Sequence, residues 1–210
     1  MTIYNYSKKK DIDPDGKGAG MQESAQWQDE ELRVNEDIVL CSVHERYVDA
    51  LYALVVANRD YLQQAMNWPQ YVTGPEETRK TAQGNYMLHH RGYAKMFLIF
   101  WRDELCGVLS FNQIEPLNKT VYIGYWLAEA MQGKGIISHS VQTIMQHYAD
   151  KGEVRRFVIK CIVTNEASNR VAQRNGFALE GRLKQAEYLN GAYHDQHIYA
   201  RIVGEDQNTP

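Results

Sequence analysis

Val121–Leu127 (VYIGYWL) and Gln132–Ser138 (QGKGIIS) are the two stretches that decide the fold of this 210-residue chain. The first is an apolar run with the length of a buried strand. The second is a short glycine-rich turn. It is followed by four apolar residues at helical spacing: Val141, Ile144, Met145 and Tyr148. A strand, a glycine turn and a helix start gather backbone N–H groups at the positive end of a helix dipole, so we predict a phosphate or pyrophosphate site.

The turn does not match two well-known nucleotide-binding motifs. No Gly-Lys-Ser/Thr run follows a four-residue spacer, so the turn is not a Walker loop. The third glycine of a dinucleotide fingerprint is missing, and no strand–helix–strand unit begins the chain. Taken alone, the turn fits a helix cap as well as it fits an anion site.

Two motifs in this order resemble the signatures of the GNAT superfamily of N-acetyltransferases. Gln132-x-x-Gly135-x-Ile137 is similar to the Q/R-x-x-G-x-G/A loop that holds the pyrophosphate of acetyl-coenzyme A in that family. Ile137 departs from the pattern, but the contact uses its backbone N–H. Asn165–Phe177 (NEASNRVAQRNGF) is similar to the second signature, N-x-x-S-x-x-(V/L)-x-x-(K/R)-x-G-F. Both motifs together are far more specific than either one.

Four further segments are similar to the ribosomal-protein-serine acetyltransferases, the RimL type within that superfamily. They are residues 67–72 (NWPQYV), 91–96 (RGYAKM), 122–127 (YIGYWL) and 184–191 (KQAEYLNG). The resemblance implies an acyltransferase with the α/β (α+β) acetyltransferase fold, in which a mixed, mostly antiparallel sheet is splayed at the cofactor site and has helices on both faces. It also implies acetyl-CoA as co-substrate and, as partner, the N-terminal serine of the acidic stalk protein of the large ribosomal subunit. A homodimer is a further expectation from the resemblance.

Length and composition indicate one domain, because 44% hydrophobic residues can build a core and 23% charged residues can solvate a surface. We expect residues 1–30 to be a disordered tail, since Asp11–Gly20 is polar and rich in turn residues, and Met21 is an alternative start. Residues 31–204 then form the domain, and residues 205–210 a short C-terminal tail. No apolar run is long enough for a bilayer, and the N-terminus does not resemble a signal peptide, so we expect a cytoplasmic protein without membrane contact.

Hydrophobic periodicity and turn residues place the remaining elements. We expect strands at residues 38–43, 95–101, 105–114, 120–127, 157–163, 178–187 and 193–203. We expect helices from Pro75 to about His90, from the glycine loop to Lys151, and around Ser168 up to Asn175. A helical face is also expected at Val48, Leu51, Tyr52, Val55 and Val56, and a tight hairpin turn at Asn190-Gly191.

Acetylation of an amine needs a proton acceptor, and it is helped by a donor to the leaving sulfur. Glu187 is the predicted base, because it ends a strand before the last hairpin and matches the glutamate of the RimL-type segment. The alternatives are that Glu187 is merely an exposed carboxylate, or that Glu115 is the base. Ser168 is the predicted donor to the sulfur, with helix capping as its alternative role.

The other predicted site residues contact acetyl-CoA. Main-chain N–H groups of the glycine loop and first helical turn should hold its pyrophosphate: Gly133, Lys134, Gly135, Ile136, Ile137 and Ser138. Trp126 and Leu127 should line the cofactor through their main chain, where the strand splays and an N–H can meet the oxyanion. Asn165 could bond the amides of the pantetheine arm and Asn169 the nucleotide end, although both also suit local helix-start bonds.

Charge, cysteines and histidines point away from other kinds of site. A net charge of −3 argues against general nucleic-acid binding. The basic pairs Arg79-Lys80 and Arg155-Arg156 are expected to be solvated surface or to pair with carboxylates. The seven histidines show no zinc-ligand spacing, so no metal is predicted. Three cysteines without paired spacing predict reduced thiols: Cys41, Cys106 and Cys161.

Three rival functions stay open at this point. The same chemistry could act on a small amine, such as a polyamine, an antibiotic or an aminoacyl-nucleotide. The chain could also be a non-catalytic acetyl-CoA sensor, or a pure interaction protein.

Overall fold

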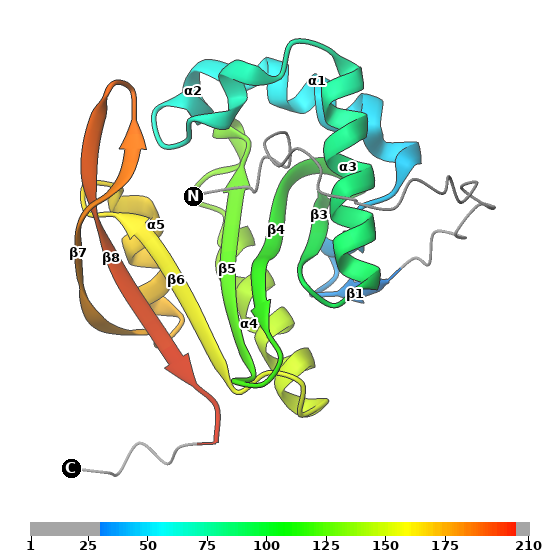
Figure 1. The fold of residues 1–210 in the computed structure, drawn as a ribbon. Coiled ribbons are helices and arrows are strands. Elements are labelled where there is room, and N and C mark those ends of the chain that lie inside the picture. Colours follow the sequence, from blue (N-terminus) through cyan, green and yellow to red (C-terminus); the bar gives the residue numbers. More distant parts are fainter. Residues whose placement is uncertain (1–29, 205–210) are drawn as a thin grey trace, which may run out of the picture.

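The apolar run becomes strand β5 (Thr120–Leu127), in the interior of an eight-stranded sheet in the computed structural model, which describes residues 30–204. The strand order is β1-β2-β3-β4-β5-β6-β8-β7 (Figure 1). β5 pairs antiparallel with β4 (Glu104–Glu115) and parallel with β6 (Arg156–Ile162), while every other pair of described strands is antiparallel. The sheet is therefore mixed and mostly antiparallel, which confirms the predicted fold class.

The remaining elements agree closely with the sequence-based expectations. The other strands are β1 (Glu31–Arg33), β2 (Ile38–Ser42), β3 (Lys95–Trp101), β7 (Ala178–Leu189) and β8 (Ala192–Ile202). The helices are α1 (Val48–Ala57), α2 (Arg59–Gln63), α3 (Pro75–His90), α4 (Ile136–Asp150) and α5 (Glu166–Arg174). Three 3-10 turns connect them: η1 (Glu45–Tyr47), η2 (Trp68–Tyr71) and η3 (Glu129–Met131). Each predicted strand is present, with ends that differ by two residues at most.

Two hydrophobic cores lie on the two faces of the sheet. Successive residues of β3 alternate between them, because side chains of a strand point to opposite faces. Phe97 and Ile99 join the core under α4, whereas Met96 and Leu98 join the core under α1, α2 and α3. The four apolar residues predicted for the inner face of α4 are all buried in the first core: Val141, Ile144, Met145 and Tyr148.

Turn residues behave as their sequence predicts at the final hairpin. Asn190 and Gly191 have φ angles of 51° and 83°, and they join β7 to β8 directly. Positive φ at both central residues is the requirement of the tight hairpin turn that Asn-Gly favours. The predicted hairpin at this position is confirmed.

The structure also departs from the expectations in three places. The three-residue strand β1 and the short helix α2 had no periodic signal long enough to predict them. Val56, predicted to lie on the inner face of its helix, is 43% exposed. Glu30, assigned to the N-terminal tail, packs into the domain, whereas residues 1–29 and 205–210 lie outside the described residues. Within residues 30–204, no helix combines the length and apolar character needed to cross a bilayer.

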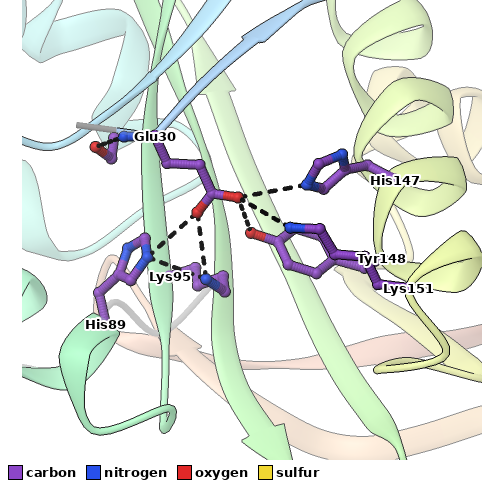
Figure 2. Close-up of polar contacts among 7 residues, drawn as sticks. Glu30, His89, Lys95, His147, Tyr148 and Lys151 are labelled. Atoms are coloured by element: carbon purple, nitrogen blue, oxygen red, sulfur yellow. Dashed lines mark hydrogen bonds and ion pairs between the residues drawn. The ribbon is translucent and has the colours of Figure 1, made fainter. Parts of the chain in front are cut away.

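Glu30 joins the C-terminal ends of α3 and α4 to the start of β3 (Figure 2). Five side chains surround its carboxylate: His89, Lys95, His147, Tyr148 and Lys151. The Tyr148 hydroxyl donates to Oε1 at 2.8 Å, and Lys95 Nζ lies 3.3 Å from Oε2. Burial acts to raise the pKa of Glu30, but hydrogen bonds with His89 and Tyr148 and the charge of Lys95 outweigh it and hold that pKa well below its usual value.

We expect Glu30→Gln to lower the free energy of unfolding by about 1–3 kcal/mol at neutral pH, because it leaves buried donors without their anionic partner. Since the pKa is lowered on folding, this contribution is fully present above pH 4.5, the usual value, and it declines as the pH falls below 4.5. Urea unfolding of both proteins at several pH values measures the difference. Glu31→Gln, on an exposed residue of β1, is the control. A difference that stays constant down to strongly acidic pH would contradict the account.

Candidate functional site

β5 and β6 pair only over their first halves. Their Cα partners run from Thr120 with Arg156 to Ile123 with Ile159, although both strands continue beyond these pairs. Figure 1 shows the two strands diverging toward the end of the sheet where α2 and the β7–β8 hairpin lie. The last residues of β5 therefore present main-chain groups that β6 does not take up. An extended ligand can pair with such groups in the manner of an added strand.

Alternation along β5 decides which of its residues face this opening. Ala128 N donates to Cys106 O of β4 at 2.8 Å. The Trp126 carbonyl also faces β4, so closely that a Cβ on Gly107 would lie 2.4 Å from its oxygen. Because the N–H and C=O groups of one strand residue point to the same side, Leu127 between them faces the opening. The main chain of Trp126 is instead directed at β4, and the contacts predicted from Leu127 and Trp126 to the cofactor stay predictions.

The Trp126 side chain lies on the face of the sheet covered by α1, α2 and α3. Its ring centroid is 5.9 Å from that of Trp68 in η2, and the residue is buried. Its indole Nε1 is buried and has no hydrogen-bond partner in the described part of the chain. An orphaned donor in this position is a polar feature of the site that the sequence did not indicate.

The glycine loop leads into α4, whose N-terminus has no side-chain cap and lies beside the opening. Gly133 and Gly135 both have a φ of 75°, which is the left-handed region that favours glycine. Gly135 is the N-cap of α4, and no side chain among residues 30–204 bonds the first-turn N–H groups there. Ile136 and Ile137 bury their side chains in the core, so their main chain is what this surface offers. With Lys134 adjacent and no acidic residue in the first turn, this helix start fits an anion.

The helix start of α5 is capped differently, and this changes the roles of two asparagines. Asn165 Oδ1 accepts from Ser168 N at 3.1 Å, so Asn165 is an N-cap. Asn169 Nδ2 donates to Asn165 O at 2.7 Å, and its Oδ1 meets the Tyr199 hydroxyl at 2.8 Å. Asn169 is buried and bonded at both ends of its amide. The contacts predicted from these asparagines to the cofactor stay predictions.

Ser168 lies at the meeting point of β5, β6 and α5. Its Oγ is 2.9 Å from the hydroxyl of Tyr125, a residue of the diverging half of β5. Burial raises the pKa of the nearby Cys161 thiol, while a hydrogen bond with Ser168 opposes the increase. The side chains of Tyr125 and Cys161 were not predicted as partners of Ser168, because these contacts depend on how β5, β6 and α5 pack together.

Glu187 is directed by an irregularity in β7. The register of β7 against β8 shifts between Leu183 and Glu187, and Gln185 in between has a φ of 50°. Beyond this bulge, the half-buried Glu187 accepts a hydrogen bond from Gln196 Nε2 at 2.9 Å. Bulges of this type re-aim side chains next to functional sites.

The same hairpin contacts the α2 region across the opening. Asn67 Nδ2 donates to Tyr188 O at 2.7 Å, and Asn190 Nδ2 donates to Gln63 O at 3.0 Å. These two bonds hold the hairpin that carries Glu187 against the α2 region.

The alternative base, Glu115, lies away from this opening. It lies at the other end of β4, opposite Thr120, the first residue of β5. Its two oxygens accept from Gln113 and Asn118, both at 3.0 Å. The opening lies at the last residues of β5, so Glu115 is at the wrong end of the strand.

Other charged and sulfur-containing residues have structural partners or surroundings. Arg79 pairs with Glu45 at 2.7 Å and Arg156 with Glu180 at 2.8 Å, as predicted for these basic pairs. The three cysteines are free thiols, two of them buried. Among residues 30–204, no three His, Cys, Asp or Glu side chains gather as metal ligands would.

Known proteins share this sequence and fold. Residues 37–178 match the family described as acetyltransferase (GNAT) domain. The ribosomal-protein-serine acetyltransferase of Escherichia coli (strain K12) is 61% identical over 174 residues, which cover 83% of this chain and 97% of that protein.

Two solved structures share the fold and carry ligands. A RimL ribosomal L7/L12 alpha-N-protein acetyltransferase, in complex with coenzyme A joined to a cysteine by a disulfide, is 59% identical with a TM-score of 0.82. That match covers 84% of this chain and all (100%) of the other. The microcin C7 self-immunity acetyltransferase MccE, in complex with acetyl-CoA and AMP, is 39% identical with a TM-score of 0.79 and covers 81% and 94% of the two chains.

We expect Gly135→Ala to weaken binding of coenzyme A by about tenfold or more. A Cβ at this position would lie 3.2 Å from the His139 ring and would strain a left-handed residue, which displaces the first turn of α4. Isothermal titration with coenzyme A measures the affinity.

The matched control is Gly152→Ala at the other end of α4. Gly152 has a φ of 68° and nothing within 4 Å of an added Cβ, so both variants lose roughly 1–2 kcal/mol of stability from backbone strain. Equal affinity of the two variants for coenzyme A would remove the glycine loop from the site.

Proposed function

Because the chain belongs to the acetyltransferase (GNAT) family, we propose that it transfers the acetyl group of acetyl-CoA to the N-terminal serine of the acidic stalk protein of the large ribosomal subunit. The observation that carries this acceptor is the similarity, over most of both chains, to a ribosomal-protein-serine acetyltransferase. The transfer is direct, within a ternary complex, and forms no acetyl-enzyme.

The proposed acetyl-CoA site uses two main-chain surfaces, the first turn of α4 and the open edge of β5. The pyrophosphate of acetyl-CoA is held by first-turn N–H groups of α4, from Ile136 to Ser138, where the helix dipole favours an anion. Gly133 and Gly135 allow the backbone to approach, and Lys134 adds a positive charge at the exposed rim. The pantetheine arm pairs with the edge of β5 that β6 leaves open.

Three residues then divide the chemistry. Glu187, oriented by Gln196, takes the proton of the attacking amine, whose solution pKa of about 8 makes a carboxylate with a bridging water sufficient. The N–H of Leu127 faces the opening and meets the oxyanion as the thioester carbonyl is attacked. The hydroxyl of Ser168 is the donor to the leaving sulfur.

The acceptor approaches between the β7–β8 hairpin and the α2 region. Tyr188 and Tyr193 are more than half exposed there, with ring centroids 5.0 Å apart. The peptide N-terminus extends toward Glu187. The unpartnered Nε1 of Trp126 lies on the face of the sheet that α1, α2 and α3 cover. A protein acceptor of the ribosome places the enzyme in the cytoplasm without direct nucleic-acid or membrane contact. The homodimer stays a prediction, which sedimentation measures.

A second candidate acceptor is an aminoacyl-nucleotide. The solved MccE structure holds AMP together with acetyl-CoA, and that protein is 39% identical to this chain. Competition decides between the two: a stable aminoacyl-AMP analogue should fail to inhibit acetylation of a serine-initiated peptide if the ribosomal protein is the acceptor.

We expect incubation with acetyl-CoA and intact ribosomes to add acetyl mass to one stalk protein, at its N-terminal serine. Peptide mass spectrometry after the reaction identifies the modified terminus. Acetylation of many unrelated N-termini at similar rates, or of none, would overturn the proposed acceptor.

We expect Glu187→Gln to lower kcat by roughly 10²–10⁴-fold, because it removes the general base. Glu180→Gln is the matched control, since Glu180 lies on the same strand and pairs with Arg156 away from the opening. Initial rates with a serine-initiated peptide compare the variants. Similar rates for both would assign the proton to another group.

A further inference from the structure

Tyr125 carries a partly buried hydroxyl group that the proposed reaction does not use. Its Oη lies 2.9 Å from Ser168 Oγ and 3.3 Å from the Ser168 main-chain oxygen. Burial raises the pKa of Tyr125 far above its usual value, although the hydrogen bond with Ser168 opposes this increase. The phenol therefore keeps its proton at neutral pH, and it can donate to Ser168 Oγ or to the Ser168 carbonyl oxygen.

The position of Tyr125 on β5, like its contact with Ser168, connects it with the opening between β5 and β6. It belongs to the half of the strand that diverges from β6, two residues before Leu127, whose N–H faces the opening. Its side chain reaches α5 on one face of the sheet, while the next residue, Trp126, packs toward Trp68 on the other. One strand thus brings a main-chain donor and a side-chain donor to the same opening.

We propose that Tyr125 is a positioning residue: its hydroxyl donates to Ser168 Oγ, so that the hydroxyl hydrogen of Ser168 is directed at the leaving sulfur. The inference rests on the proposed function, because it requires a thioester at the opening between β5 and β6. Tyr125 does not touch the substrate and does not give up its proton.

The physical reason lies in the freedom of a serine hydroxyl. Its hydrogen rotates toward whichever acceptor is best placed, and serine near a helix start readily bonds local backbone carbonyls. The main chain of Ser168 is fixed by the Asn165 cap, but this cap does not direct the Oγ hydrogen, which can also turn toward the Cys161 thiol. A donor that occupies one lone pair of Oγ turns the hydrogen outward. Each bond in the chain from Tyr125 to Ser168 to sulfur also polarises the next.

A double-mutant cycle tests this coupling, with Tyr125→Phe, Ser168→Ala and the two combined. Tyr125→Phe should lower kcat by about 5- to 30-fold, the effect of one lost hydrogen bond to the donor, with little change in KM for acetyl-CoA or peptide. In the Ser168→Ala background the same change should alter kcat by less than about twofold, because its target is gone.

Tyr148→Phe is the matched control for the loss of a buried phenol. Its hydroxyl donates to Glu30 at 2.8 Å, at the far end of α4, so this variant should lose stability and keep the wild-type kcat. A Tyr125→Phe effect of equal size with and without Ser168, or one confined to KM, overturns the proposal. Wild-type protein that fails to acetylate any serine-initiated peptide overturns the proposed function instead, and the role of Tyr125 with it.

Discussion

The parting of β5 from β6 is the constraint on which the rest of the structure depends. Backbone N–H and C=O groups need partners, and a strand that loses its neighbour halfway must find others. The first half of β5 is paired on both sides, and its apolar residues Val121 and Ile123 are buried in the core under α4. That rigid half holds the second half in place, with the side facing β6 open to an extended ligand.

Everything proposed for the reaction is arranged around this opening, where the two substrates meet from opposite faces of the sheet. The glycine loop, α4 and α5 form the donor side, where an uncapped helix start and Ser168 lie. The η2 turn and the β7–β8 hairpin form the acceptor side, tied together by Asn67 and Asn190. At the other end of α4, the Glu30 carboxylate joins α3, β3 and α4.

Local rules predicted most of the fold and part of the candidate site. The period of apolar residues in α4, the Asn190-Gly191 turn and the two glycines before Ile136 depend on a few neighbouring residues, so the sequence was sufficient for them. Glu115 and Trp126 show what such reasoning does not reach, which is the direction and register of a strand. Strand position made both plausible, but the register of β4 against β5 places Glu115 at the closed end and turns the Trp126 carbonyl toward Gly107.

The sequence by itself determined the order of the elements, the glycine turn with its helix and the family to which its two motifs point, because dihedral preference and hydrophobic periodicity act within a few residues. Only the tertiary structure decided that Tyr125 meets Ser168, that Glu30 lies against Lys95 and Tyr148, and that Gln196 orients Glu187. Most of these contacts join residues far apart in the chain, and all of them depend on strand register, bulges and the packing of helices on the sheet. No local pattern of residue types encodes those distances.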